Sequence, residues 1–96
     1  MSAYASVDVD LKDPEGYQKY LREAPRIIAK HGGEYLVRGG GFEIVEGEWQ
    51  PHRLVLLRFP DMKSIRALFD DPEYQPLKAL RHKCALSSIV AVEGVG

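Results

Sequence analysis

The sequence predicts an α+β fold, in which four strands and two helical regions follow one another in the order βαββαβ. Apolar and polar residues alternate in residues 3–10, which is typical of a half-buried strand. Apolar residues then recur at helical spacing between residues 13 and 33, and two further strand patterns follow before the next helical region. This order is typical of the ferredoxin-like split βαβ arrangement, a four-stranded antiparallel sheet with helices on one face. At 96 residues, the chain makes one domain, residues 1–96.

The first strand and first helix are well marked. Asp13 is suited to cap a helix whose first position is Pro14, and Gly32 is suited to end it. Pro25 lies inside this helix and is expected to kink or break it. The apolar stripe of the helix is Tyr17, Tyr20, Leu21, Ala24 and Ile28.

The middle of the chain predicts a long second strand with an interruption. Residues 34–38 continue, after the glycines 39–41, as the strand pattern 42–46, and residues 47–51 form a hairpin loop into a third strand at 52–59. A phosphate-binding loop would lead into a helix, whereas these glycines lead into a strand pattern. We therefore expect a bulge or bend that directs the strand's second half towards a partner subunit.

The last third of the chain predicts two helices and a strand. Asp61 is expected to cap a helix over residues 60–71, and Asp71 to cap a second helix over 71–83. The final strand covers residues 86–95.

Composition excludes several classes of protein. The formal net charge of −1 and the absence of a basic stripe argue against nucleic-acid binding, and leucines replace the aromatic residues that an RNA-binding third strand would need. No apolar run is long enough to cross a membrane, and the N-terminus does not resemble a signal peptide. With one cysteine, Cys84, no intrachain disulfide forms. We expect a cytoplasmic protein.

The face of the sheet without helices carries apolar residues. In the third strand, Leu54 and Leu56 alternate with residues that face the helices, and Leu36 occupies the same face of the second strand. Burying each leucine is worth about 1.5–3 kcal/mol. A second copy of the chain is the simplest cover, so we expect a homodimer.

Polar residues on this uncovered face form a candidate site. Arg38 and Arg58 are expected at the same level of the sheet, where they would bind a small anionic ligand through a carboxylate or enolate, with Asp8 as general base. An alternative is that Asp8 and Arg58 form an ion pair that holds the dimer together. Tyr74 either packs in the core or directs its hydroxyl towards the cavity as a catalytic group.

Two further residues are expected near the ligand. His52 begins the third strand beside Trp49, and the tryptophan is suited to insert into the partner subunit. His31 is explained by the end of its helix, and His82 by solvent. The histidines are too scattered for a metal site, so neither a metal nor a cofactor is expected.

Four segments carry a resemblance to a known family: residues 31–49, 53–61, 70–81 and 87–95. Over nearly the whole chain the sequence resembles the bacterial family named domain of unknown function 1330, of the dimeric α+β barrel superfamily. The resemblance implies two ferredoxin-like subunits packed sheet to sheet. Relatives in that superfamily include cofactor-free monooxygenases, isomerases, decarboxylating enzymes and ligand-binding regulators.

Two functions follow as expectations. The first is a small cofactor-free enzyme that acts by acid–base or oxidative chemistry on a small organic acid or aromatic compound. Its cavity, lined by Arg38, Arg58, Asp8 and Tyr74, is expected either between the sheet and the helices or inside the barrel of the dimer. The second is a non-catalytic dimer that binds a ligand or has a structural role.

Overall fold

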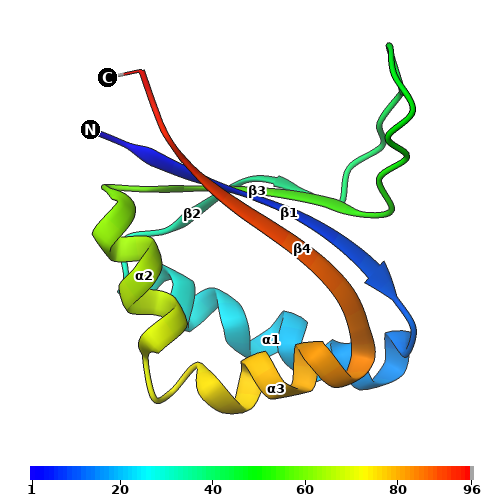
Figure 1. Ribbon diagram of the computed structural model, residues 1–96. Helices are drawn as coiled ribbons and strands as arrows, with labels where there is room; N and C mark the ends of the chain where they lie inside the picture. Colours follow the sequence, from blue (N-terminus) through cyan, green and yellow to red (C-terminus); the bar gives the residue numbers. More distant parts are fainter. Residues whose placement is uncertain (96) are drawn as a thin grey trace.

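The computed structural model describes residues 1–95 and confirms the ferredoxin-like α+β fold (Figure 1). Three helices lie against one face of a four-stranded antiparallel sheet with the strand order β2-β3-β1-β4. The elements are β1 (Ala3–Leu11), α1 (Pro14–Lys30), β2 (Glu34–Arg38), β3 (Leu54–Phe59), α2 (Met62–Asp70), α3 (Gln75–Cys84) and β4 (Ala85–Glu93).

The two central strands bury one face, as their alternation predicts. In β1, Ala3, Ala5, Val7 and Val9 are buried against the helices. Their partners in β3 include Leu57, opposite Ala5, and Phe59, opposite Ala3, and both partners are also buried. Directly opposed residues of an antiparallel pair point to the same face, so the register assigns one face of the whole sheet to the core.

Helix α1 begins as predicted but passes through its proline. The Asp13 carboxylate accepts a hydrogen bond from the Gly16 amide at 3.1 Å, and α1 continues through Pro25 to Lys30. Proline has no N–H, so the carbonyl four residues earlier, that of Leu21, lacks its helical donor. This free carbonyl has a partner elsewhere, described below with the site.

The turn between the last two helices differs from the prediction. Asp71 does not cap α3, because α3 begins at Gln75 and residues 71–74 form a turn. The Asp71 carboxylate instead accepts hydrogen bonds from the Glu73 amide, the Lys30 ammonium and the His31 ring, at 2.9, 2.9 and 2.7 Å. Asp71 therefore ties this turn to the end of α1, and the His31 hydrogen bond, followed by that of Lys30, lowers the pKa of its carboxyl.

The predicted second half of strand two is not a strand. Residues 39–53, called the arm, leave the sheet after Arg38 without regular secondary structure and project from the body (Figure 1). The edge strand β2 pairs only with β3, which begins at Leu54, so residues 42–46 have no neighbouring strand to pair with. The hairpin expected around residues 47–51 is likewise absent, and residues 39–50 are all exposed.

The helix-free face of the sheet carries exposed apolar side chains and is uncovered in the single chain. Its exposed large apolar side chains belong to the two edge strands, β2 and β4: Leu36, Val37, Leu86, Val90 and Val92. Within residues 1–95, no helix is both long and apolar enough to cross a membrane.

Candidate functional site

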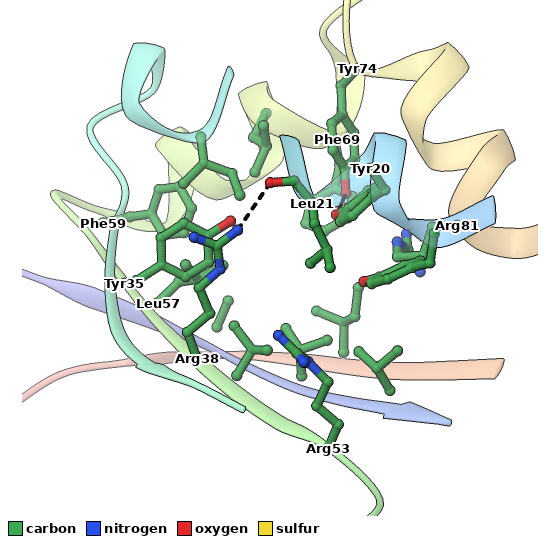
Figure 2. Close-up of a pocket in the computed structure, with 18 residues that line it drawn as sticks. Tyr20, Leu21, Tyr35, Arg38, Arg53, Leu57, Phe59, Phe69, Tyr74 and Arg81 are labelled. Carbon is green, nitrogen blue, oxygen red and sulfur yellow. Dashed lines mark hydrogen bonds between the residues drawn. The ribbon is translucent and has the colours of Figure 1, made fainter. Parts of the chain in front are cut away.

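A cavity lies on the opposite side of the sheet from the predicted site, between the sheet and the helices (Figure 2). The volume open to the centre of a water molecule is about 50 Å³. One water needs roughly 10–15 Å³ on such a measure, so the space exceeds a single water site. Its walls are mainly aliphatic and aromatic, and its polar side chains are Arg38, Arg53, Arg81, Tyr17, Tyr20, Tyr35 and Tyr74.

A β-bulge turns Arg38 into this cavity. Tyr35 pairs with Leu57, and after a shift in register Val37 pairs with Leu56 and Arg38 with Val55. The expectation that Arg38 shares the uncovered face with Leu36 is therefore wrong, because the extra residue reverses the alternation.

Two contacts hold Arg38 at the mouth of the cavity. Its guanidinium lies 4.6 Å from the centre of the Tyr35 ring, within range of a cation–π interaction. One Nη donates a hydrogen bond to the Leu21 carbonyl at 3.0 Å (Figure 2). That carbonyl is the one that Pro25 leaves without a helical donor. The proline in α1 thus supplies an acceptor for an arginine of the sheet.

Arg53 reaches the cavity from the end of the arm. Its backbone is fixed by a hydrogen bond from its amide to Asp8 at 3.3 Å and by one from the Val9 amide to its carbonyl at 2.9 Å. Gly39 leaves room for the Arg53 guanidinium, because a Cβ at residue 39 would lie 2.8 Å from the Arg53 Cζ. Gly39 also has φ of +72°, a conformation that side chains disfavour.

Arg81 is the deepest of the three arginines. Its residue is 4 % exposed, and it lies in the last turn of α3, where a cation interacts favourably with the helix end. One Nη donates to the Ser87 hydroxyl at 3.0 Å, but the buried Nε has no hydrogen-bond partner in the described chain. Among residues 1–95, no carboxylate lies within ion-pair distance of Arg38, Arg53 or Arg81.

Tyrosine rings form the wall that faces the sheet. Tyr17 and Tyr20, one turn apart on α1, stack with ring centres 5.0 Å apart, and the Tyr20 hydroxyl lies 2.6 Å from that of Tyr74. Burial raises the pKa of Tyr17, Tyr20 and Tyr35, so these hydroxyls stay protonated at neutral pH. Of the two arrangements expected for Tyr74, the structure combines both: its ring is buried in the core and its hydroxyl lies at the cavity.

The other candidates do not join this cavity. Asp8 lies on the helix-free face, where its carboxylate accepts hydrogen bonds from the amides of His52 and Arg53 at 2.8 and 3.3 Å. The His52 ring Nδ1 lies 3.5 Å from the same carboxylate. Asp8 and His52 therefore hold the base of the arm.

The expected cluster of Arg38, Arg58 and Asp8 is wrong on geometric grounds. Arg58 pairs across the sheet with Tyr4, while Asp8 lies opposite Leu54, and the bulge sends Arg38 to the other face. Arg58 forms an ion pair with Glu34 instead of the predicted pair with Asp8.

Trp49 lies in the arm, and its 64 % exposure leaves it without a partner within the described chain. Among residues 1–95, no group of three or more His, Cys, Asp or Glu side chains is arranged to hold a metal ion.

The sequence prediction missed several of the residues that line the cavity. Tyr17 and Tyr20 were assigned only to a buried helical stripe. The sequence prediction includes neither Arg53 nor Arg81, although Arg81 follows Leu77 by four residues and precedes Cys84 by three. A charged residue in phase with a buried stripe was the available signal.

The sheet order and the cavity between sheet and helices define a ferredoxin-like domain of the kind found in dimeric α+β barrels. The chain belongs to the family described as Domain of unknown function (DUF1330), whose profile matches residues 2–95. This confirms the resemblance noted from the sequence. No curated protein matches the chain.

Solved structures agree on the fold. The RPA0582 protein of unknown function from Rhodopseudomonas palustris is 17 % identical with a TM-score of 0.78, covering 99 % of this chain and 83 % of that one. SnoaB, a cofactor-independent oxygenase from Streptomyces nogalater, is 9 % identical with a TM-score of 0.68, covering 99 % and 94 %. A dimeric ferredoxin-like protein of unknown function from Jannaschia sp. CCS1 is 14 % identical with a TM-score of 0.64, covering 98 % and 100 %. At sequence identities of 9–17 %, the similarity to these structures establishes the fold alone.

Proposed function

We propose that this protein is a cytoplasmic homodimer that binds a small, mostly apolar organic anion in the cavity between sheet and helices. The observation that carries the proposal is an excess of positive charge. Three guanidinium groups line one apolar cavity, no carboxylate lies within ion-pair distance of them in the described chain, and the buried Nε of Arg81 has no partner. Arg81 is buried, Arg53 is half-buried and Arg38 is exposed at the mouth. Buried charges are normally paired, so the missing partner of Arg81 is expected to be the ligand.

The lining favours an aromatic or cyclic carboxylate or an acidic phenol. Arginine binds carboxylates through paired N–H donors, and the aromatic and aliphatic walls match an apolar body. Phosphate would also bind arginine, but it would leave the apolar walls without a partner. The tyrosine hydroxyls are uncharged at neutral pH, so they can donate hydrogen bonds to an anion without repelling it.

The same arrangement supports cofactor-free catalysis on the bound anion. Fixed guanidinium groups in a site of low polarity stabilise a phenolate or enolate, which is the form that reacts in acid–base chemistry or with dioxygen. The fold that the chain shares with the oxygenase SnoaB accommodates such chemistry, although a shared fold does not carry a function.

A specific observation favours binding without turnover as the second candidate. In the described part of the chain, no Asp, Glu or His side chain lines the cavity. Asp8, the predicted general base, lies on the other face of the sheet, so a proton would have to leave the substrate through water.

The homodimer is proposed from the uncovered face of the sheet. Leu86, Val90 and Val92 of β4 are each more than half exposed. The dimeric Jannaschia protein has the same fold. Sheet-to-sheet packing would remove these side chains from water.

Thermal unfolding with matched ligands tests the proposal. Benzoate, phenylacetate and salicylate would be compared with the corresponding neutral amides at fixed protein concentration. A ligand at ten times its dissociation constant stabilises by about 1.4 kcal/mol. For a domain of this size that corresponds to a rise in melting temperature of roughly 6–11 °C. Acids are expected to stabilise and amides are not. Equal effects of both, or none from any acid, would contradict the proposal.

Turnover is measured separately. Dioxygen consumption and product formation would be followed with acidic phenols that bind. Their absence for every bound phenol would favour the binding protein over the enzyme.

A further inference from the structure

The polar side chains of the cavity offer many hydrogen-bond donors and few acceptors. Guanidinium groups have five donors and no acceptor. In the described chain, the acceptors that meet the cavity arginines are the Leu21 carbonyl for Arg38 and the Ser87 hydroxyl for Arg81. Most of the remaining donors are therefore available to a ligand.

The pair formed by Tyr20 and Tyr74 has a donor left over. The two hydroxyl oxygens are 2.6 Å apart, so one proton lies between them. Each hydroxyl carries one proton, which leaves a second proton on whichever oxygen accepts. Within residues 1–95, neither hydroxyl has another hydrogen-bond partner.

This surplus donor is shielded from solvent, fully if it lies on Tyr74 and partly if it lies on Tyr20. Tyr74 is 2 % exposed, and the Tyr74 ring meets those of Tyr20 and Phe69 edge-on, which fixes where its hydroxyl points. Burial, and next the neighbouring Tyr74, raise the pKa of Tyr20.

In Figure 2 the hydroxyl pair and the guanidinium of Arg53 approach the cavity from opposite sides. The tyrosines belong to α1 and to the turn before α3, whereas Arg53 precedes β3 in the sheet. A ligand whose anionic group contacts Arg53 therefore presents the rest of its body to the tyrosines, whereas Arg81, on α3, lies on the same side as the tyrosines.

We infer that the ligand carries a second oxygen, a carbonyl or a phenol oxygen, which accepts the free hydroxyl proton of the Tyr20–Tyr74 pair across an apolar body from its anionic group. This inference rests on the proposed function and narrows its ligand to oxo- or hydroxy-substituted aromatic or cyclic acids. The tyrosine pair acts in it as the specificity-determining element, while the arginines supply the attraction for the anion.

The test compares two ligands that differ in one acceptor. Acetylbenzoate and isopropenylbenzoate have nearly the same shape, but only the first has a carbonyl oxygen, and both meta and para isomers would be titrated calorimetrically. One neutral hydrogen bond corresponds to about a three- to tenfold preference for acetylbenzoate in the wild-type protein. In the double variant Tyr20→Phe with Tyr74→Phe, the preference is expected to fall to about one.

The double variant is chosen because a single one leaves a donor. With only Tyr74→Phe, the Tyr20 hydroxyl keeps its proton and loses its partner, which costs stability, whereas replacing both hydroxyls preserves shape and is nearly neutral. Tyr4→Phe, on the other face of the sheet, is the matched control and should keep the wild-type preference.

The outcomes separate the two proposals. Binding of both acids without a preference, or a preference that persists in the double variant, would overturn the inference and leave the anion site standing. Failure of both acids and of benzoate to bind would overturn the inference together with the proposed function.

Discussion

Replacing Arg81 by methionine is expected to stabilise the ligand-free protein and to weaken anion binding. Arg81 is 4 % exposed, has no ion-pair partner in the described chain, and leaves its Nε without a hydrogen bond. A residue that lowers the stability of the folded protein is expected at a position where it is needed to bind a ligand. If Arg81 has only a structural role, its removal should have the opposite effect on stability.

The size of the gain follows from two opposing contributions. Burying an ion costs several kcal/mol, whereas the hydrogen bond from the guanidinium to Ser87 returns roughly 1.5–3 kcal/mol and the interaction with the end of α3 about 0.3–1 kcal/mol. Methionine fills a similar volume without a polar atom to satisfy. We expect a net stabilisation of about 1–2 kcal/mol. For a domain of this size that is roughly 4–16 °C in melting temperature.

The assay is thermal unfolding of dialysed protein at fixed concentration, followed by titration with benzoate. Arg66→Met is the matched control, because Arg66 is exposed on α2, outside the cavity. The control should change the melting temperature little and keep the affinity. A melting temperature of Arg81→Met below that of the control, or benzoate affinity equal to the wild type, would refute the reasoning.

Three further predictions concern the supports of the site and the pH dependence of stability. Pro25→Ala restores an N–H that can bond the Leu21 carbonyl, so the denaturation midpoint should rise by an amount equivalent to about 1–3 kcal/mol; a fall would contradict this use of the proline. Gly39→Ala forces a Cβ to 2.8 Å from Arg53 at φ +72°, so urea unfolding should show a loss of at least about 1 kcal/mol and calorimetry a weaker affinity for benzoate. Asp71→Asn should lower the melting temperature at neutral pH. Because the folded pKa of Asp71 lies below its unfolded value, the stabilisation is present above about pH 4 and is lost as pH falls through the folded pKa. A difference in melting temperature between Asp71→Asn and the wild type that stays constant down to pH 2 would contradict this.

The elements that the sequence predicts well are those specified by local patterns. The alternation in β1, the cap at Asp13 and the apolar stripe of α1 each depend on neighbours within a few residues, and all appear in the structure. Residues 42–46 of the arm are predicted as a strand because they are rich in apolar residues that favour strands, whereas a strand also needs a partner, and the described chain offers none.

The location of the site could not be predicted from the same patterns. Arg38 changes face because the bulge lies between Tyr35 and Val37, ahead of the glycines 39–41 where the sequence predicts it, and a shift of one residue in register reverses every later side chain. The three cavity arginines come from β2, the end of the arm and α3, so only the tertiary fold brings them together. The glycines do explain part of the site, since Gly39 makes room for Arg53.

The most direct test of the anion site is a crystal structure of the protein soaked with bromobenzoate, located by the anomalous signal of bromine. The ring is expected in the cavity between sheet and helices. The ligand carboxylate should lie within hydrogen-bond distance of the Arg81 guanidinium and accept a hydrogen bond from the Arg81 Nε. A ligand found only on the outer surface, or one in the cavity whose carboxylate contacts none of Arg38, Arg53 and Arg81, would contradict the account.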